Sequence, residues 1–278
     1  MTTRFDGKVA LVTGAARGQG RSHALRFAEE GADIIAIDLC DQIDSVAYPM
    51  PRPEDLDETV NLVEKTGRRI IAEQNDVRDY ERMKDMVRRA VADLGRLDFV
   101  LANAGVIPGI GMPSPDIAAY VDAVEVMLSG VYFTIEAALP SLLENEEGGV
   151  IVITSSAAAF KSLSPSFGTR NHGAAGYTAA KHGAVGVMRY YATTLAEKNI
   201  RVNSVHPTGV ATPMIVNEVV DQYSAEHPEF ATLMQNLLPG VSVIEPVDVT
   251  EAMVYLCGDS GRYVTGSTLT IDAGILLK

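Results

Sequence analysis

Short apolar runs alternate with longer amphipathic stretches along this 278-residue chain, and this alternation limits the folds open to it. Strands buried on both faces are nearly continuous in Val, Ile and Leu, and parallel strands need a long crossover between them. The rhythm therefore predicts a parallel sheet covered by helices. The expected strands are Val9–Thr13, Asp33–Asp38, Arg69–Asn75, Leu97–Ala102, Val150–Thr154, Arg201–His206 and Thr268–Asp272.

The stretch after Asp79 shows how the intervening segments form helices. Apolar residues recur there at steps of three and four, Asp79 is suited to an N-cap, and Gly95 follows as a C-terminal stop. With right-handed crossovers, these elements build an α/β fold, a single Rossmann-type doubly wound parallel sheet of about seven strands with helices on both faces.

We expect a single catalytic domain over residues 1–278, because no linker, low-complexity run or repeat divides the chain. Three segments interrupt the rhythm: insertions near 39–53 and 160–175, and a long, partly helical segment near 208–245. All three follow strands at the carboxyl edge of the sheet, where ligands bind in such folds. We expect 208–245 to cover the substrate, whereas plain surface decoration explains the first two equally well.

Composition excludes several classes of partner. The net charge of −13 argues against nucleic acid or an anionic membrane. Neither a membrane-spanning apolar stretch nor a signal-peptide pattern stands out, so we expect a cytoplasmic protein. Cys40 and Cys257 form no CxxC pair, and the histidines lack zinc-ligand spacing, so no metal site is predicted.

A glycine-rich segment, Thr13–Gly20, lies between the first strand and a helix. Its amides can approach a pyrophosphate at the helix N-terminus, although its G-x-x-x-G-x-G spacing differs from the G-x-G-x-x-G fingerprint. Asp38 ends the second strand, where a carboxylate accepts hydrogen bonds from a ribose and repels the extra phosphate of NADP. Arg17 favours NADP, but the carboxylate dominates, so we predict NAD as cofactor.

Tyr177 and Lys181 are four residues apart, which places both on one face of a helix. An ammonium stabilises a phenolate, so we expect the pKa of Tyr177 to fall toward neutral and its hydroxyl to exchange a proton with an alcohol or ketone. A hydroxyl from Ser155 or Ser156, at the end of the fifth strand, would position the same oxygen. A Tyr and a Lys at this spacing are common on helix surfaces, so the pair alone does not indicate catalysis. The position of the pair after the other motifs favours a catalytic role.

That order resembles the short-chain dehydrogenase/reductase family over essentially the whole chain. The matching motifs are Thr13–Gly20, Asp76-Val77, Ala102-Asn103-Ala104-Gly105, Ser155-Ser156, Tyr177–Lys181, His206-Pro207-Thr208-Gly209 and Asp272-Ala273-Gly274. The resemblance implies that Ser156, Tyr177 and Lys181 are catalytic, with Ser156 preferred over Ser155. It also implies these cofactor contacts: Gly14, Arg17, Gly18, Gln19, Gly20, Asp38, Leu39, Asp76, Val77, Asn103, Ala104, Gly105, Tyr177, Lys181, Pro207, Val210 and Thr212.

A narrower resemblance is to the carveol-dehydrogenase-like, mycofactocin-coupled branch of the family. It rests on the loop Ala16–Arg21, on Asp38–Cys40 and Tyr48–Met50 around the first insertion, and on Tyr177–Gly183. It implies an apolar cyclic or terpenoid alcohol or ketone as substrate, and a bound NAD that exchanges slowly and needs an external redox acceptor. Family resemblance further implies a homotetramer.

Two departures from the family pattern stand out. Met127 occupies the position where the family usually carries an asparagine that supports a proton relay, and a thioether cannot replace the hydrogen bonds of an amide. The insertion near 160–175 separates Ser156 from Tyr177 by more residues than is usual, and its Ser164, Ser166, Asn171 and His172 are candidates for substrate contact. The alternative function is a catalytically weak dinucleotide-binding or sensing protein on the same fold.

Overall fold

The computed structural model describes residues 3–110 and 116–278. Its strands are β1 (Val9–Thr13), β2 (Asp33–Asp38), β3 (Ile70–Gln74), β4 (Phe99–Ala102), β5 (Gly149–Thr154), β6 (Ile200–Pro207) and β7 (Thr268–Ile271). The α-helices are α1 (Gly18–Glu29), α2 (Pro53–Glu64), α3 (Tyr80–Leu94), α4 (Ile117–Val124), α5 (Gly130–Leu143), α6 (His172–Thr194), α7 (Glu218–Glu226), α8 (Pro228–Leu233) and α9 (Pro246–Cys257).

All seven strands are parallel and lie in the order β3-β2-β1-β4-β5-β6-β7. The strand order reverses between β1 and β4, which opens a crevice at their carboxyl ends. This confirms the predicted fold. The predicted strands differ from the observed ones by at most two residues at either end, because hydropathy locates a buried run better than its last ladder hydrogen bond.

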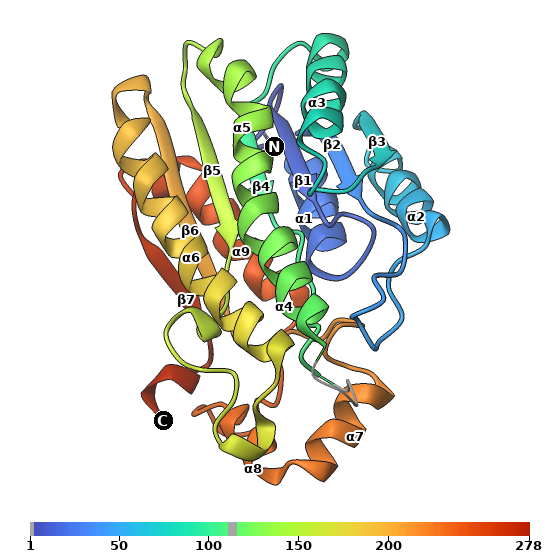
Figure 1. The fold of residues 1–278 in the computed structure, drawn as a ribbon. Helices are drawn as coiled ribbons and strands as arrows, with labels where there is room; N and C mark the ends of the chain where they lie inside the picture. The colour runs from blue at the N-terminus through green and yellow to red at the C-terminus, as the bar shows by residue number, and fades with distance from the viewer. Residues whose placement is uncertain (1–2, 111–115) are drawn as a thin grey trace.

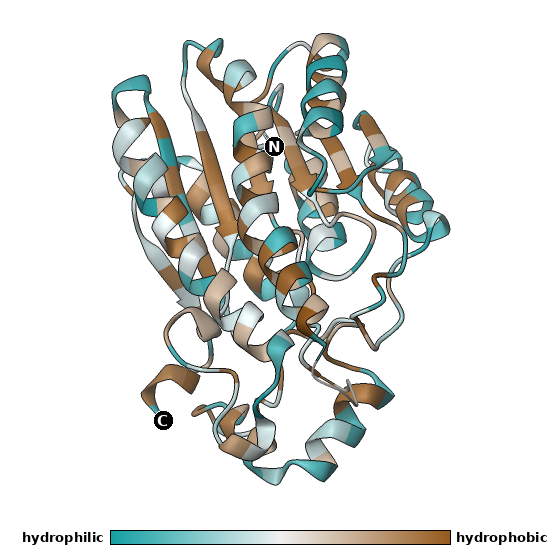
Figure 2. Ribbon diagram, viewed as in Figure 1, coloured by the Kyte–Doolittle hydropathy of each residue, from teal (hydrophilic) through white to brown (hydrophobic). Residues whose placement is uncertain are grey.

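Helices cover both faces of the sheet (Figure 1). α3, α5 and α6 pack on one face around an apolar cluster that includes Leu11, Ile135 and Ile151, whereas α1, α2 and α9 pack on the other around Val12 and Met253. The strands are predominantly hydrophobic, and α2 and α3 are largely hydrophilic on their outer faces, whereas α4 carries hydrophobic positions (Figure 2). Asp79 caps α3 by accepting a hydrogen bond from the Arg82 amide, and Gly95 ends it in the left-handed conformation, as predicted.

One long helical stretch corrects the expectation that the chain has no apolar run long enough to span a membrane. The residues from Ile117 to Leu143 are apolar enough and long enough to cross a membrane by composition alone. Half of the most apolar window is buried inside the protein, and α4 and α5 contact α6 and α3, respectively. The stretch is therefore weak evidence for a membrane span, since a core helix has the same composition.

The insertion at 39–53 forms an ordered cover beside the crevice. The Gln42 amide holds it together, donating to the Val46 carbonyl at 2.8 Å and accepting from the Met50 amide at 3.0 Å. Tyr48 is only 2% exposed, and its hydroxyl accepts a hydrogen bond from the Ile107 amide at 3.2 Å. This segment is therefore fastened to the loop that follows β4.

The segments near 160–175 and 208–245 are built differently from the insertion at 39–53. The loop predicted over 160–175 ends earlier, because Asn171 caps α6 by accepting a hydrogen bond from the Ala174 amide at 2.7 Å, and α6 begins at His172. The segment 208–245 carries the short helices α7 and α8, and none of the residues of α7 is buried. α7 and α8 lie below the sheet in Figure 1, at its carboxyl edge.

Candidate active site

The glycine loop turns tightly from β1 into α1. Gly14 has a φ of +69°, and a Cβ on it would lie 2.9 Å from the Cα of Ala104. At Gly20 a Cβ would lie 1.9 Å from the Gly14 carbonyl oxygen, so neither position tolerates a side chain. The loop backbone therefore lies against the end of β4 and leaves the amides at the start of α1 open to a cavity.

That space, which we call the cofactor cavity, runs along the carboxyl edge of β1, β2 and β4. The predicted site residues that line it are Gly14, Arg17, Gly18, Gln19, Gly20, Asp38, Leu39, Asp76, Val77, Asn103, Ala104, Gly105 and Thr212. The insertion contributes Ile43, Tyr48, Met50 and Pro51 to its wall. The structure thus brings together residues that are up to about two hundred positions apart in the chain.

Asp38 is held in place by two backbone amides. Its carboxylate oxygens accept hydrogen bonds from Ala16 at 2.9 Å and from Cys40 at 3.1 Å. Burial raises the pKa of Asp38, while these hydrogen bonds act in the opposite direction. The Arg17 guanidinium donates to the Pro49 carbonyl at 2.7 Å and so ties the glycine loop to the insertion.

Asp76 and its neighbour Asn75 differ in their hydrogen bonding. The Asp76 carboxylate is occupied by Arg78, whose Nε lies 3.1 Å from Oδ1 and 2.9 Å from Oδ2 and whose amide donates to Oδ1 at 2.9 Å. Asn75 is 2% exposed and lines the same cavity, yet within the described part of the chain neither its Oδ1 nor its Nδ2 has a hydrogen-bond partner. Sequence reasoning missed Asn75, although its place before Asp76 was visible.

Asn103 joins three strands beneath the cavity. Its Nδ2 donates to the Thr13 carbonyl at 3.0 Å, and its Oδ1 accepts from the Thr154 hydroxyl at 3.1 Å. β1, β4 and β5 are thereby held in register at their carboxyl ends, where Ala104 and Gly105 follow. The predicted floor of the cavity is therefore a hydrogen-bonded support.

Ser156 and Tyr177 line a second space, which we call the substrate-side cavity, at the ends of β5 and β6. Ser155 is turned away, because its hydroxyl donates to the Lys181 carbonyl at 3.0 Å. Burial raises the pKa of Tyr177, contrary to the lowered value expected from Lys181, while a hydrogen bond with Ser156 acts to lower it. The geometry thus separates the two serines, which the sequence alone could not.

Lys181 lies one helical turn beyond Tyr177 and is 4% exposed. Its ammonium donates to the Thr154 carbonyl at 2.9 Å and lies 5.6 Å from the centre of the Tyr177 ring. Burial lowers its pKa to about 8, which leaves it mostly protonated at neutral pH. A Cβ on Gly105, which lines the cofactor cavity, would lie 3.7 Å from this ammonium. Lys181 itself lines neither cavity and lies between Gly105 and Tyr177.

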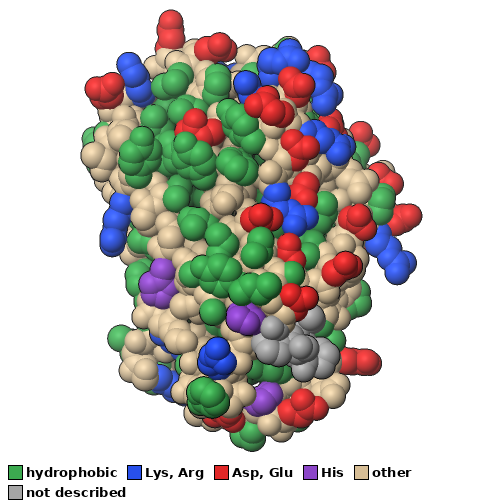
Figure 3. Space-filling view, in the orientation of Figure 1, with side chains coloured by type: hydrophobic (Ala, Val, Ile, Leu, Met, Phe, Trp, Pro, Cys, Tyr) green, Lys and Arg blue, Asp and Glu red, His purple; other side chains and the backbone are tan. Residues whose placement is uncertain are grey.

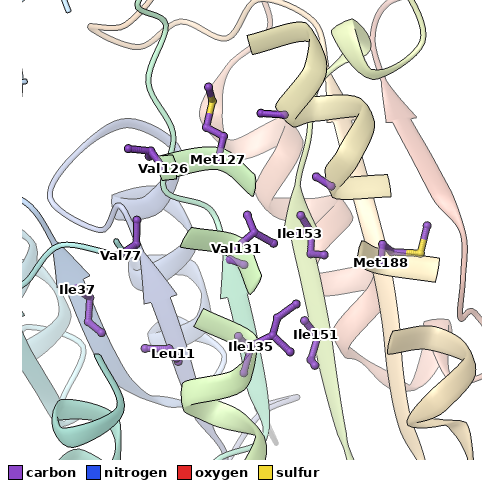
Figure 4. Close-up of a cluster of buried hydrophobic side chains, with 14 of the residues drawn as sticks. Leu11, Ile37, Val77, Val126, Met127, Val131, Ile135, Ile151, Ile153 and Met188 are labelled. Atoms are coloured by element: carbon purple, nitrogen blue, oxygen red, sulfur yellow. The ribbon is translucent and has the colours of Figure 1, made fainter. Parts of the chain in front are cut away.

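Met127 lies in a short π-helical segment, Glu125–Ser129, between α4 and α5. It is fully buried among apolar side chains that include Val126 and Val131 (Figure 4). A Cβ on Gly105 would lie 3.6 Å from its sulfur and 3.7 Å from the Lys181 ammonium, so both side chains reach Gly105. The thioether of Met127 is a weak acceptor that donates nothing.

His206 holds the backbone of Ser156 through a hydrogen bond. Its Nδ1 lies 3.0 Å from the Ser156 carbonyl oxygen, and its Nε2 lies 2.8 Å from the Ser204 hydroxyl. A carbonyl can only accept, so Nδ1 carries the proton and Nε2 accepts from Ser204. Burial lowers the pKa of His206 to about 4, which keeps the ring neutral.

The remaining predicted residues lie partly in the cavities and partly outside them. Pro207 lines the substrate-side cavity, and Thr212 the cofactor cavity. Val210 lines neither and instead forms a β-bridge with Ile244. In the loop before α6, Ser164 donates to the Thr169 carbonyl and Ser166 to a Glu229 carboxylate oxygen, and neither lines the substrate-side cavity.

Comparison with known proteins bears on this arrangement. A family model described as enoyl-(acyl carrier protein) reductase, which belongs to the short-chain dehydrogenases/reductases, matches residues 14–276. An uncharacterized oxidoreductase of Mycobacterium tuberculosis is 46% identical over 275 residues, covering 99% of this chain and 98% of that protein. A (-)-trans-carveol dehydrogenase of Rhodococcus erythropolis is 44% identical over 285 residues, covering 99% of each.

Among solved structures, the carveol dehydrogenase of Mycobacterium avium in complex with NAD superposes with a TM-score of 0.90 at 43% identity, covering 100% of both chains. The match extends over the whole length of the fold. The sequence matches and the fold agree with the order of motifs along the chain. This protein is therefore an oxidoreductase of the short-chain dehydrogenase/reductase family.

Proposed function

We propose that this enzyme transfers a hydride between a secondary alcohol or ketone and NAD, with Tyr177 as general acid and base. The observation that carries the proposal is the position of the Lys181 ammonium between Gly105, which lines the cofactor cavity, and Tyr177, which lines the substrate-side cavity. Ser156 and Tyr177 line the substrate-side cavity, and Gly105, beside the Lys181 ammonium, lines the cofactor cavity. A substrate carbon placed beside Tyr177 would thus lie next to a cofactor held along β1 and β4.

The residues of the cofactor cavity fit NAD. The backbone amides at the start of α1 can bind the pyrophosphate, and each Asp38 oxygen keeps a lone pair for a ribose hydroxyl. The Asp38 carboxylate would repel an added phosphate, and the Arg17 guanidinium is directed to the Pro49 carbonyl. To the contacts expected from the family we add Asn75, because its buried amide has both polar atoms available.

A bound nicotinamide would supply the hydride donor or acceptor, and the protein would move the proton. Tyr177 takes the hydroxyl proton of the alcohol and returns it to the ketone oxygen in the reverse direction. The Ser156 hydroxyl donates to the same oxygen and fixes its position. The Lys181 ammonium favours the phenolate form of Tyr177 and so offsets the effect of burial on its pKa.

The substrate-side cavity favours an apolar cyclic alcohol or ketone. Its wall includes Ile107, Leu163, Ile215, Leu233, Met234 and Ile275. Such a wall binds a hydrocarbon ring and leaves orientation to a few polar groups. The carveol dehydrogenase of Rhodococcus erythropolis, 44% identical, is named for a cyclic terpenoid alcohol, and this supports a carveol-like substrate here.

We extend the proposal to cofactor exchange and assembly. The buried insertion at 39–53 closes the cavity wall beside Asp38, and this supports slow NAD exchange and a mycofactocin-type external acceptor. A homotetramer is supported by hydrophobic side chains that gather over α5 and α6 (Figure 3), where Tyr132 and Tyr190 are 43% and 61% exposed. A single catalytic domain and a cytoplasmic location remain predictions.

The test follows reduced-nicotinamide absorbance after cyclic secondary alcohols, carveol included, are added with excess NAD. Wild type is expected to give a signal, and Tyr177→Phe to lose about 10²–10⁴-fold of the rate while NAD affinity, measured by titration, is unchanged. Turnover by Tyr177→Phe at the wild-type rate would contradict the role of Tyr177.

Met127 supports the alternative, a catalytically weak dinucleotide-binding or sensing protein, because a thioether that donates no hydrogen bond stands where the family usually carries an asparagine. If folded, NAD-loaded wild type gives no signal with any alcohol and Met127→Asn restores one, the alternative holds.

A further inference from the structure

Among the residues that the structure describes, Lys161 is the one charged residue that lines the substrate-side cavity. The other polar residues there are Ser156 and Tyr177, at the reacting end, and Ser162 and Thr208. Ser162 donates its hydroxyl proton to the Ser164 carbonyl, and Thr208 donates to the Asn236 side-chain oxygen. Neither hydroxyl therefore has a proton left to give to a ligand.

The Lys161 ammonium has one hydrogen-bond acceptor, the Leu233 carbonyl at 3.0 Å. An ammonium carries three donors, so two are left over. Within residues 3–110 and 116–278, no carboxylate lies within ion-pair distance of it. The nearest acid that acts on it, Asp272, has its two oxygens accepting from the Gly274 and Leu276 amides.

Partial burial makes this arrangement costly for the protein. Desolvation lowers the pKa of Lys161, and Lys278 acts in the same direction, while Asp272 opposes them. A desolvated charge destabilises a protein unless an opposite charge or further hydrogen bonds satisfy it. The cavity that Lys161 lines is where a ligand would supply that partner.

We propose that Lys161 is a second substrate anchor, and that the substrate is a cyclic alcohol or ketone bearing a carboxylate away from the reacting carbon. The inference rests on the proposed function and narrows its substrate class. Ser156 and Tyr177 would hold the reacting oxygen, the apolar wall the ring, and the two free N–H groups of Lys161 the carboxylate. In a protein with a net charge of −13, a local cation such as Lys161 favours the binding of an anion in this cavity.

The competing role for Lys161 is a tether. Leu233 is the last residue of α8, and a cation at a helix C-terminus is favourable. A tether would hold α8 over the cavity for every substrate alike. An anchor would discriminate between a charged and a neutral ligand of the same shape, and the experiment exploits this difference.

The experiment measures binding of two matched ketones, 4-oxocyclohexanecarboxylate and 4-methylcyclohexanone, to the NAD-loaded enzyme by calorimetry. Wild type is expected to bind the carboxylate at least about tenfold more tightly, and high salt to reduce this preference. Lys161→Met should abolish the preference by weakening the carboxylate alone, whereas Lys161→Arg should retain part of it. Lys198→Met, at an exposed lysine, is the matched control.

No preference in wild type, or an equal loss for both ketones in Lys161→Met, would overturn the proposal. Because binding is measured without turnover, the two proposals fail separately. A Lys161-dependent preference without hydride transfer to the carboxylate ketone would retain the anchor and reject the dehydrogenase. If wild type turned over both corresponding alcohols with equal kcat/KM, the dehydrogenase would be retained and the anchor rejected.

Discussion

The two covers of the active site are built differently. On the cofactor side, the insertion at 39–53 buries Ile43, Val46 and Tyr48 and is fastened by Gln42. On the substrate side, α7 contributes no buried residue, and Val216 just before it is 60% exposed. A segment with few buried contacts opens at lower free energy than one packed into the core. The difference supports the proposed slow exchange of NAD, and we propose that substrate enters on the more loosely packed side.

The largest expected effect separates the two covers by stability. Tyr48→Ala should lower the free energy of unfolding by about 3–5 kcal/mol, because it empties a fully buried aromatic site. Val216→Ala, its matched partner on the exposed cover, should change it by no more than about 0.5 kcal/mol. Urea titrations of both variants measure this. Similar losses in the two would show that the covers are packed alike.

The second prediction concerns acid on the substrate side. The pKa of His206 is about 4 in the folded protein, below the ordinary value of 6.5. The unfolded chain therefore binds the proton first, so the stability from His206 is present above pH 6.5 and is lost as pH falls from 6.5 to about 4. The contribution of His206 to the slope of the unfolding free energy against pH should be at most about 1.4 kcal/mol per pH unit.

Urea titrations between these pH values should show a shallower slope in His206→Asn than in wild type. His182→Asn, which changes an exposed histidine, serves as control. An unchanged slope in His206→Asn would show that another group causes the acid sensitivity.

The third prediction concerns the role of Asn75 in NAD binding on the cofactor side. Asn75→Leu keeps the number and branching of the side-chain heavy atoms and removes two unpartnered polar atoms. We expect NAD affinity to fall about tenfold while the protein without NAD becomes no less stable, because the amide has no protein partner to lose. Calorimetric titration with NAD and thermal unfolding measure the two effects. Nicotinamide mononucleotide, which lacks the adenosine, is the control ligand and should bind both proteins equally.

The smallest effect concerns the fastening of the insertion. The Ser45 hydroxyl donates to the Asp122 carboxylate at 2.6 Å, and the same carboxylate binds Arg78 at 3.1 Å. Ser45→Ala should speed the exchange of bound NAD several-fold, because one charge-assisted hydrogen bond between the insertion and α4 is lost. Release of labelled NAD under excess unlabelled NAD measures this rate. Ser162→Ala, in the substrate-side cavity, should leave it unchanged.

Local patterns predicted much of this protein. The strands were found because burial on both faces leaves continuous apolar runs, and α3 because its caps and period are contained in about fifteen neighbouring residues. The glycine loop and the four-residue spacing of Tyr177 and Lys181 were visible for the same reason. These features depend on residues close together in the chain, so the sequence by itself determined them.

Tertiary structure decided which polar groups are free to act. Ser155 and Ser156 are neighbours, yet only the packing of α6 against the turn that follows β5 brings the Ser155 hydroxyl to the Lys181 carbonyl. Asn75 and Asp76 are also neighbours, and the partners of Arg78, including Asp122 some forty residues away, determine that Asp76 is occupied. Hydrogen bonds and desolvation depend on contacts between segments far apart in the chain. The sequence therefore determined the scaffold and the reactive pair, whereas only the fold decided which neighbouring side chains remain available to ligands.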